Sequence, residues 1–152
     1  MKKITPFLWF DTEAEEAMNF YVSVFKNSKA GNVSHGPDGK AFIVNFELDG
    51  QEFIGLNAGP QFKFNESVSF YVDCENQEEV NYYWEKLTAD GGEESMCGWL
   101  KDKYGLSWQI IPKALTELMG DPDPVKAQRV TQAMLEMRKI DVAGLQRAYD
   151  AG

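Results

Sequence analysis

The chain has 152 residues, enough for one domain or for two half-domains that share a core. Hydrophobic residues make up 43% and charged residues 26%, an ordinary balance for a protein with a sizeable core. The net charge of −9 argues against nucleic acid and against anionic membrane surfaces as partners. No apolar run approaches the roughly 20 residues that span a bilayer, and no long apolar segment follows the basic N-terminus, so we expect no secretory signal. Cys74 and Cys97 are too few for a disulfide framework, which favours reduced thiols in a cytoplasmic protein.

The chain repeats itself when it is shifted by 62 positions, so that the segment 7–25 falls on 69–87. Five pairs along this stretch are identical: Asp11/Asp73, Glu13/Glu75, Glu16/Glu78, Asn19/Asn81 and Tyr21/Tyr83. Four further pairs exchange one apolar residue for another: Phe10/Val72, Met18/Val80, Phe20/Tyr82 and Phe25/Leu87. An internal repeat of this length predicts two copies of one supersecondary unit.

The first copy contains one predicted helix among strands. Residues 5–10 form the first predicted strand, and Thr12 to Glu15 has the pattern of a capping box that starts a helix reaching about Phe25. The segment 27–40 is rich in Gly, Ser, Asn and Pro and is predicted to be mostly loop, with room for a short strand near 30–35. Strands at 41–48 and 51–57 follow, joined at Asp49-Gly50 by a hairpin turn.

The second copy has the same order. A strand at 67–73 precedes a helix that Asn76 caps together with Glu79, and Gly91-Gly92 ends this helix. A strand near 95–100, a turn at 102–105 and a strand at 106–111 complete the copy. Gly50 and Gly105 are interpreted as equivalent turn positions at an offset of 55, which makes the second copy seven residues shorter.

Each copy therefore has the order strand–helix–strand–strand–strand, and the predicted class is α+β. We expect modules at 4–59 and 66–112 to pair into a curved mixed sheet, with helices on the outer face and a cavity on the inner face. The tail, 113–152, shows no strand pattern. It predicts a helical turn at 114–119, a helix after 121–124 that reaches about Arg138, and a last helix capped by Asp141. The tail is interpreted as packing or dimer-interface structure, with a lid over the cavity as the alternative.

Several segments of the chain resemble one known family. They are Ile4 to Asp11, Phe46 to Phe53, Gly59-Pro60 with Phe62, Phe64 and Asn65, Gln77 to Val80, Cys97 to Gly105, and Ser107 to Pro112. Together with the duplicated unit they resemble the PhnB-like branch, often labelled 3-demethylubiquinone-9 3-methyltransferase, of the vicinal-oxygen-chelate superfamily that includes glyoxalase I and bleomycin-resistance proteins. The resemblance covers nearly the whole chain and implies a single domain over 1–152 and a homodimer. It specifies the activity much less, since this fold hosts several chemistries and pure binders.

The resemblance also implies a divalent metal held by His and Glu on the inner face of the sheet. The corresponding positions fall at about Thr5, Ile54, Ser67 and Gln109, and none is a His or a carboxylate. Glu52 could supply one ligand from a neighbouring position, but one carboxylate makes a poor transition-metal site. The single histidine, His35, is predicted to be a solvated loop residue. We therefore expect no metal and no other cofactor.

The methyltransferase label finds no support in the residues, because no strand leads into a helix through the Gly-rich turn that S-adenosylmethionine enzymes use. The residues instead suggest a pocket for a planar or aromatic ligand, with no catalytic residue assigned. The candidate binding residues are Trp9, Glu52, Ser69, Trp99, Asp102, Trp108 and Gln109. The competing interpretation makes both Trp99 and Trp108 core, Asp102 a turn residue and Cys97 a small buried group.

Three functions remain open at this point. The first is a small-molecule binder, or an enzyme, that lacks the usual metal. The second is a metal-dependent lyase or dioxygenase with atypical ligands such as Glu52. The third is an assembly protein without a ligand, acting through its C-terminal helices.

Overall fold

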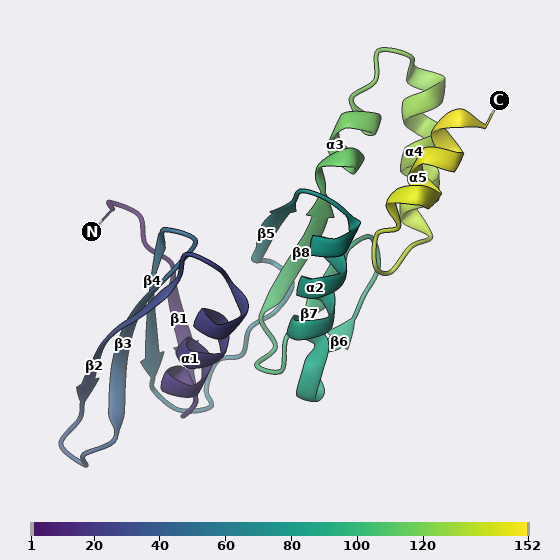
Figure 1. Cartoon of the computed structure of the whole chain (residues 1–152). Coiled ribbons are helices and arrows are strands. Elements are labelled where there is room, and N and C mark those ends of the chain that lie inside the picture. The colour runs from purple at the N-terminus through teal and green to yellow at the C-terminus, as the bar shows by residue number, and fades with distance from the viewer. Residues whose placement is uncertain (1, 152) are drawn as a thin grey trace. The chain divides into compact units, whose positions relative to one another are not determined.

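The computed structural model describes residues 2–151 and divides into two compact units, the first ending at Phe64 and the second beginning at Asn65 (Figure 1). Each unit contains a four-stranded mixed sheet and a helix packed on it, and the second unit also carries the tail helices. This confirms the α+β class, the duplicated module and the helical extension. The cavity shared by both modules stays a prediction.

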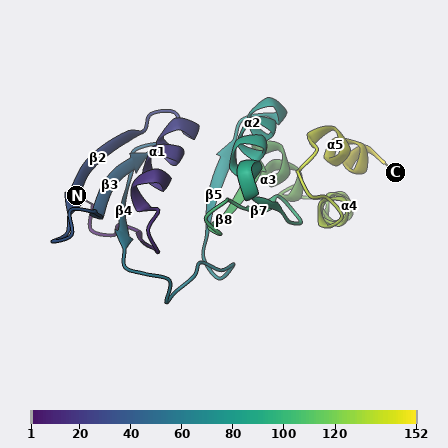
Figure 2. The same ribbon diagram turned by 90° about the horizontal axis from the view of Figure 1, so that it is seen from below.

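The N-terminal unit comprises β1 (Phe7–Phe10), α1 (Ala14–Val24), β2 (Lys29–His35), β3 (Ala41–Leu48) and β4 (Gln51–Asn57). Its strand order is β1-β4-β3-β2, with β1 parallel to β4 and the other pairs antiparallel. The hairpin between β3 and β4 turns at Asp49 and Gly50, with φ of 48° and 78°, as the sequence predicts. Helix α1 covers one face of this sheet, where Ala14 approaches Gly55 (Figure 2).

The predicted capping box at Thr12 is wrong. The helix begins at Ala14, and the amide of Ala14 donates to Oδ1 of Asn57 at 2.8 Å. The other end of the same side chain, Nδ2 of Asn57, donates to the carbonyl of Ala41 at 3.1 Å. Because Asn57 ends β4, the start of α1 is fixed by the sheet beneath it and not by its own first turn. The short strand expected near 30–35 is present as β2, but it has seven residues and fills more of the segment 27–40 than the predicted loop allows.

The C-terminal unit contains β5 (Ser69–Cys74), α2 (Gln77–Thr88), a short 3₁₀ turn (Ala89–Gly91), β6 (Glu93–Glu94), β7 (Trp99–Lys101) and β8 (Ser107–Pro112). The strand order is β5-β8-β7-β6, and β5 runs parallel to β8. The predicted cap on α2 is confirmed: Asn76 Oδ1 accepts from the amide of Glu79 at 3.0 Å, and Glu79 Oε1 accepts from the amide of Glu75 at 3.2 Å.

The predicted continuous strand at 95–100 is wrong. The chain turns at Cys97 and Gly98, with φ of 61° and 84°, and separates two short strands. The amides of Cys97 and Gly98 donate to the carbonyls of Met137 and Arg138 at 2.7 and 2.8 Å, so the tail holds this turn in place. The φ of 84° at Gly98 favours glycine, and a Cβ there would also lie 3.1 Å from the carbonyl oxygen of Ile110.

The strand pairing also corrects the alignment of the two copies. Phe7 lies opposite Ile54, and its repeat Ser69 lies opposite Ser107. The last strands therefore correspond at an offset of 53 and not 55, which makes the counterpart of Gln109 the apolar residue Leu56.

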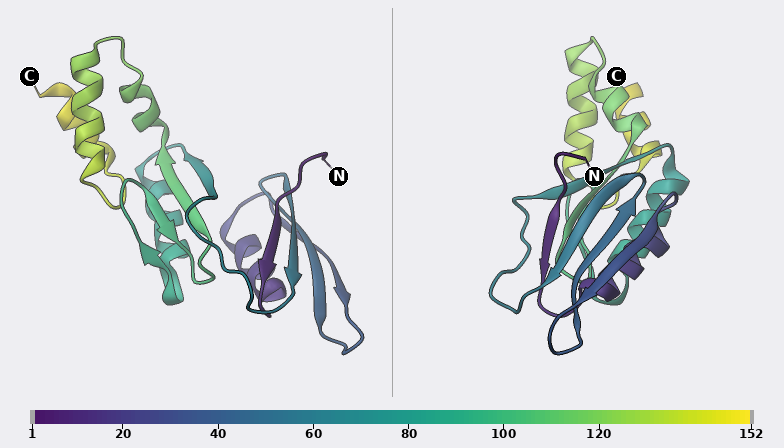
Figure 3. Two further views of the ribbon diagram at one scale, coloured as in Figure 1. Left: turned by 180° about the vertical axis from the view of Figure 1, so that it is seen from behind. Right: turned by 90° about the vertical axis from the view of Figure 1, so that its left-hand side faces the viewer.

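The tail forms α3 (Lys113–Met119), α4 (Pro124–Leu135) and α5 (Val142–Asp150), gathered beyond the end of β8 (Figure 3). As predicted, Asp123 and Pro124 start α4, and Asp123 Oδ1 accepts from the amide of Val125 at 2.9 Å. The helices share a buried cluster with the end of β8, made of Ile111, Leu115, Val130, Ile140 and Leu145. The tail is thus packed into the core of its own unit. No helix among residues 2–151 combines the length and the apolar character that a bilayer crossing requires.

The prediction that Asp141 caps the last helix is wrong, because Gln77 of α2 performs this role. Its Oε1 accepts from the amide of Val142 at 2.7 Å, and its Nε2 donates to the carbonyl of Ile140 at 3.0 Å. One side chain therefore holds the start of α5 against α2.

We predict that Gln77→Ala lowers the free energy of unfolding by about 1–3 kcal/mol, since it removes both partners of the Ile140–Val142 backbone. Urea denaturation measures the loss, and hydrogen exchange should show a faster amide at Val142. Gln77→Glu keeps the acceptor for Val142 and should protect this amide better than alanine does. The control Gln146→Ala, on exposed α5 surface, should change neither measurement. Unchanged exchange at Val142 in Gln77→Ala would contradict this role.

Candidate functional site

The N-terminal sheet leaves one face without a helix. Side chains alternate along each strand, so Val44, Phe46 and Phe53 are buried in the core. The intervening residues lie on the opposite face and are half-buried or exposed: Phe7, Trp9, Ile43, Asn45, Glu47, Glu52, Ile54 and Leu56. We call this surface the open face of the N-terminal sheet.

A groove of about 220 Å³ lies on this open face. Polar and apolar groups alternate around it, and its lining includes Thr5, Lys29, Gly31, Asn32, Asn45, Glu47, Glu52 and Ile54. A mixed lining of this kind is typical of sites that hold a small organic molecule. Of the seven predicted binding residues, the structure places Glu52 in this groove.

The charged residues of the groove stand side by side on neighbouring strands. Glu47 of β3 lies opposite Glu52 of β4, and on its other side it lies opposite Lys29 of β2. The Lys29 ammonium is 3.8 Å from the Glu47 carboxylate. Two carboxylates against one ammonium give the groove an excess of negative charge, which disfavours anionic ligands.

A β-bulge shapes the wall of the groove. The pairing of β2 with β3 shifts between Ala30 and Val33, at the position of Gly31 and Asn32. A Cβ on Gly31 would lie 2.5 Å from the carbonyl oxygen of Asn45, so the backbones approach too closely for any other residue. Sequence reasoning missed these lining residues because it interpreted 27–40 as mostly loop; the Gly-Asn pair inside KAGNVSH was the available signal for a bulged strand.

Trp9 shares the open face but supports the chain that follows β4. Its Nε1 donates to the carbonyl of Gly59 at 2.9 Å, and its ring meets the edge of Phe62 at a centroid distance of 4.9 Å. In this arrangement Trp9 fixes the segment after Asn57 beside β1.

The C-terminal sheet brings together three of the predicted residues on the face opposite α2. Gln109 of β8 lies opposite Trp99 of β7, and its Nε2 donates to Ser69 Oγ of β5 at 3.0 Å. All three are half-buried. Gln109 thus lies on the face of this sheet opposite α2, and its projection into a cavity shared by both modules stays a prediction.

Asp102 and Trp108 occupy a different environment from these three residues. Trp108 is only 3% exposed, and its Nε1 donates to Asp102 Oδ2 at 2.9 Å. Asp102 is 2% exposed, and its Oδ1 accepts from the amides of Tyr104 and Leu106 at 2.9 and 3.1 Å. The carboxylate thus holds the β7–β8 turn and anchors the indole. Asp102 and Trp108 thus have a structural role in the protein without a ligand, and their contact with a ligand stays a prediction.

The residues present do not fit the metal site that the resemblance implies. His35 ends β2 and is exposed, at the end of a strand and not in the predicted loop. Within residues 2–151 no three His, Cys, Asp or Glu side chains gather closely enough to hold a metal ion. Two of the positions where the resemblance implies metal ligands, Thr5 and Ile54, line the groove. Their side chains are a hydroxyl and an alkyl group, neither of which suits a transition metal. No chemical step through a metal follows from these side chains.

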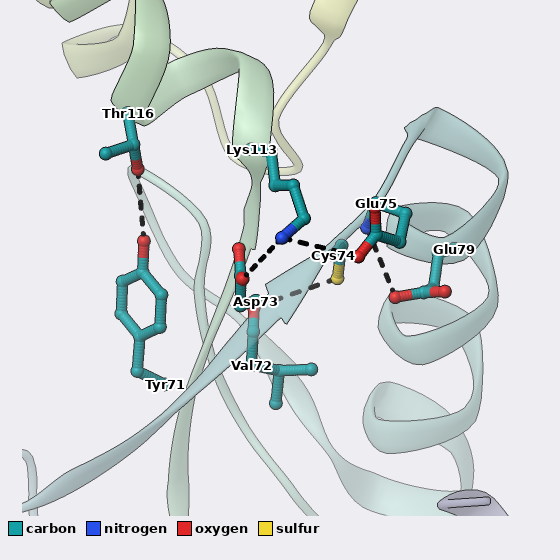
Figure 4. Close-up of polar contacts among 8 residues, drawn as sticks. All are labelled: Tyr71, Val72, Asp73, Cys74, Glu75, Glu79, Lys113 and Thr116. Carbon is teal, nitrogen blue, oxygen red and sulfur yellow. Dashed lines mark hydrogen bonds and ion pairs between the residues drawn. The ribbon is translucent and has the colours of Figure 1, made fainter. Parts of the chain in front are cut away.

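A polar cluster joins β5 to α3 in the C-terminal unit (Figure 4). The Lys113 ammonium lies 3.2 Å from Asp73 and 3.3 Å from Glu75, and the two carboxylates, Asp73 first, raise the pKa of Lys113. Beside them the thiol of Cys74 is buried, and this burial, followed by the charges of Glu79 and Asp73, raises its pKa to about 12. Cys74 is therefore a protonated thiol at neutral pH and a poor nucleophile.

We predict that Asp102→Asn lowers the free energy of unfolding by about 2 kcal/mol. The amide group can accept hydrogen bonds only through its oxygen, so at least one buried N–H donor loses its partner. Urea denaturation measures the change, and Asp11→Asn, at an exposed position, should leave stability within about 0.5 kcal/mol of the parent. An Asp102→Asn variant of full stability that alters only ligand binding would instead place this carboxylate in contact with the ligand.

Comparison with known proteins identifies the family. The family model described as 3-demethylubiquinone-9 3-methyltransferase matches residues 2–111. The PhnB protein from Bacillus cereus, which carries the same methyltransferase description, has 37% sequence identity and a TM-score of 0.68. The match covers 73% of this chain and 99% of that chain. No curated protein matches the chain.

Two more distant structures share the fold alone. Protein PA1353 from Pseudomonas aeruginosa is 14% identical over 74% of this chain and 98% of its own, with a TM-score of 0.58. The fosfomycin resistance protein FosX from Listeria monocytogenes, solved with Mn(II) and sulfate, is 16% identical over 71% of this chain and 88% of its own, with a TM-score of 0.51. The chain thus belongs to the PhnB-like family described as 3-demethylubiquinone-9 3-methyltransferase, within the vicinal-oxygen-chelate superfamily.

Proposed function

We propose that this protein binds a small organic molecule in the groove on the open face of its N-terminal sheet, through its own side chains and without a His/Glu metal site. The observation that carries the proposal is the groove itself, with its bulged wall at Gly31 and its mixed lining. Bulges often occur beside functional sites, where they re-aim side chains. A homodimer in the cytoplasm remains our expectation for the assembly and its location.

The volume and the lining of the groove limit the size and the charge of the ligand that it can hold. A volume of about 220 Å³ corresponds to roughly seven water molecules, or to a ligand of roughly ten non-hydrogen atoms. The side-chain amides of Asn32 and Asn45 can each donate and accept hydrogen bonds, while Ile54 offers an apolar contact. With the carboxylates of Glu47 and Glu52 present, these groups favour a neutral or positively charged polar molecule over an anion.

The alternative functions fit these residues less well. A metal-dependent lyase or dioxygenase would have to use Glu47 and Glu52 as its ligands, whereas transition-metal sites of this kind use three or four groups and usually include His. An assembly role through the tail would use its exposed apolar side chains, Met119, Val125 and Leu135, which are scattered over α3 and the two ends of α4. The larger apolar cluster of Leu115, Val130 and Leu145 is already used within the tail's own core.

Methyl transfer is also disfavoured by the strand–helix junctions. S-adenosylmethionine enzymes usually place a Gly-rich turn between the first strand and helix. Here the junction after β1 consists of Asp11, Thr12 and Glu13, and the junction after β5 consists of Glu75 and Asn76. Neither contains glycine, so binding of a small ligand explains the site better than transfer of a methyl group.

Substituting two positions of the same strand tests the proposal. Ile54 and Leu56 both lie on the open face of β4, but only Ile54 lines the groove. We predict that Ile54→Trp fills the groove and removes the thermal stabilisation given by compounds from a library of small polar molecules. Leu56→Trp should keep the stabilisation, because ligands that bind only the folded chain raise its stability wherever their site is intact.

The metal content of the purified protein provides the second arm of this test. Elemental analysis should find divalent metal far below one equivalent per chain. A stoichiometric metal whose loss removes ligand binding would contradict the proposal, and so would compounds that stabilise Ile54→Trp as strongly as the parent.

A further inference from the structure

The C-terminal unit contains a separate pocket of about 130 Å³, formed entirely by its own residues. Its lining includes Glu66, Glu93, Glu94, Trp99, Lys101 and Ser107. None of them belongs to the groove of the N-terminal sheet. The pocket therefore requires an explanation of its own.

The pocket contains a buried hydroxyl without a partner. Ser107 is 0% exposed, and its Oγ has no hydrogen-bond partner among the described residues 2–151. Such a group is uncommon, because a buried hydroxyl that loses its bonds to water destabilises the fold unless another group replaces them. The oxygen of Ser107 remains available to accept a hydrogen bond and its proton remains available to donate one.

An ion pair crosses the sheet beside this hydroxyl. Ser107 of β8 lies between Ser69 of β5 and Lys101 of β7. The Lys101 ammonium reaches the carboxylate of Glu66, just before β5, at 3.2 Å, so the pair spans β8 at the level of Ser107. Both side chains are partly exposed, and an ion pair in this environment is weak enough to yield to a ligand.

The charges around the pocket select for a cation. Of the three acidic residues that line it, Glu66 and Glu93 lie beside Lys101, while Glu94 is paired with groups outside the pocket, which leaves an excess of negative charge. Glu94 accepts from Trp84 Nε1 at 2.6 Å and lies 3.8 Å from Arg138, whereas Glu93 forms no ion pair within residues 2–151. The half-buried ring of Trp99 adds an aromatic face, which attracts organic cations.

We propose that this pocket is a second binding site, which takes a small organic ammonium that donates to Ser107 Oγ and lies against Glu93 and the ring of Trp99. Its volume corresponds to roughly four water molecules, so the ligand has roughly four to six non-hydrogen atoms. Ethanolamine has this size and charge. The proposal does not depend on the groove of the N-terminal sheet, because the two sites share no residue.

Titration of the full-length protein with ethanolamine tests the site, with acetamide and acetate as neutral and anionic molecules of similar size. The ring N–H signal of Trp99 reports binding by nuclear magnetic resonance. We expect saturable binding of ethanolamine with a Kd on the order of 1 mM, as fits so small a ligand, and no saturation by the other two. Ser107→Ala should weaken the binding of ethanolamine about tenfold while raising the urea midpoint, since it removes a buried unpaired hydroxyl.

Two further variants separate this site from nonspecific attraction. Glu93→Gln should weaken ethanolamine binding, whereas Glu85→Gln, an equal change of charge at an exposed position on α2, should not. Ile54→Trp should leave this titration unchanged, so failure of the groove and failure of this site can be told apart. The proposal is overturned if ethanolamine does not saturate the Trp99 signal, or if it binds Ser107→Ala as tightly as the parent. It is equally overturned if Ser107→Ala is less stable, because the hydroxyl would then already have a partner such as a bound water.

Discussion

Within each unit, α1 or α2 covers one face of the sheet, and among the described residues the opposite face has helices of its own unit only where the tail packs on Ile111. Both candidate sites lie on these opposite faces. Alternation along the strands sends Val44, Phe46 and Phe53 into the core and leaves Asn45, Glu52 and Ile54 on the open face. A position without a covering helix can carry polar and charged groups at little cost to stability. The residues on the core side of the sheet therefore stabilise the fold, while those on the other side can vary and bind a ligand.

The duplication preserved the framework and let the open faces diverge. The identical pairs of the repeat, such as Glu13/Glu75 and Tyr21/Tyr83, lie at or next to the strand–helix junctions and in the helices. Across the open faces the counterparts differ, since Leu56 corresponds to Gln109 and Ile54 corresponds to Ser107. Two sheets with one topology thus present different chemistry, which is why we infer two sites with different ligands.

The sequence predicted the parts of the fold that depend on neighbouring residues. The hairpin at Asp49-Gly50 requires only that both residues tolerate positive φ, and the cap on α2 lies within its own first turn. The wrong predictions concern helix starts and a turn whose positions are fixed by residues far away in the sequence. Asn57 fixes the start of α1, Gln77 fixes the start of α5, and the tail bends the chain at Cys97 and Gly98. No local pattern carries this information.

The same distinction applies to the candidate site. Glu52 and Gln109 were chosen from the strand register that the family resemblance implies, and the structure puts Glu52 in the groove and Gln109 on the face opposite α2. The hydrogen bond between Gln109 and Ser69 was not predicted. Trp108 and Asp102 were chosen for their chemical type, but β8 turns the indole toward the core, where the carboxylate holds it. The Gly31-Asn32 pair signals a bulge, but the close approach of Gly31 to Asn45 exists only after β2 and β3 have paired, so the sequence alone does not place the groove wall.

The central claim is that the open face of the N-terminal sheet recognises a ligand, and mapping a bound compound by nuclear magnetic resonance tests it most directly. A compound that stabilises the protein should shift the side-chain amide signals of Asn32 and Asn45 and the methyl signals of Ile54 in a saturable manner. The signals of Val44 and Leu8, on the core side of the same sheet, should move little. Saturable shifts confined to the tail helices, with Asn45 and Ile54 unaffected, would contradict the account.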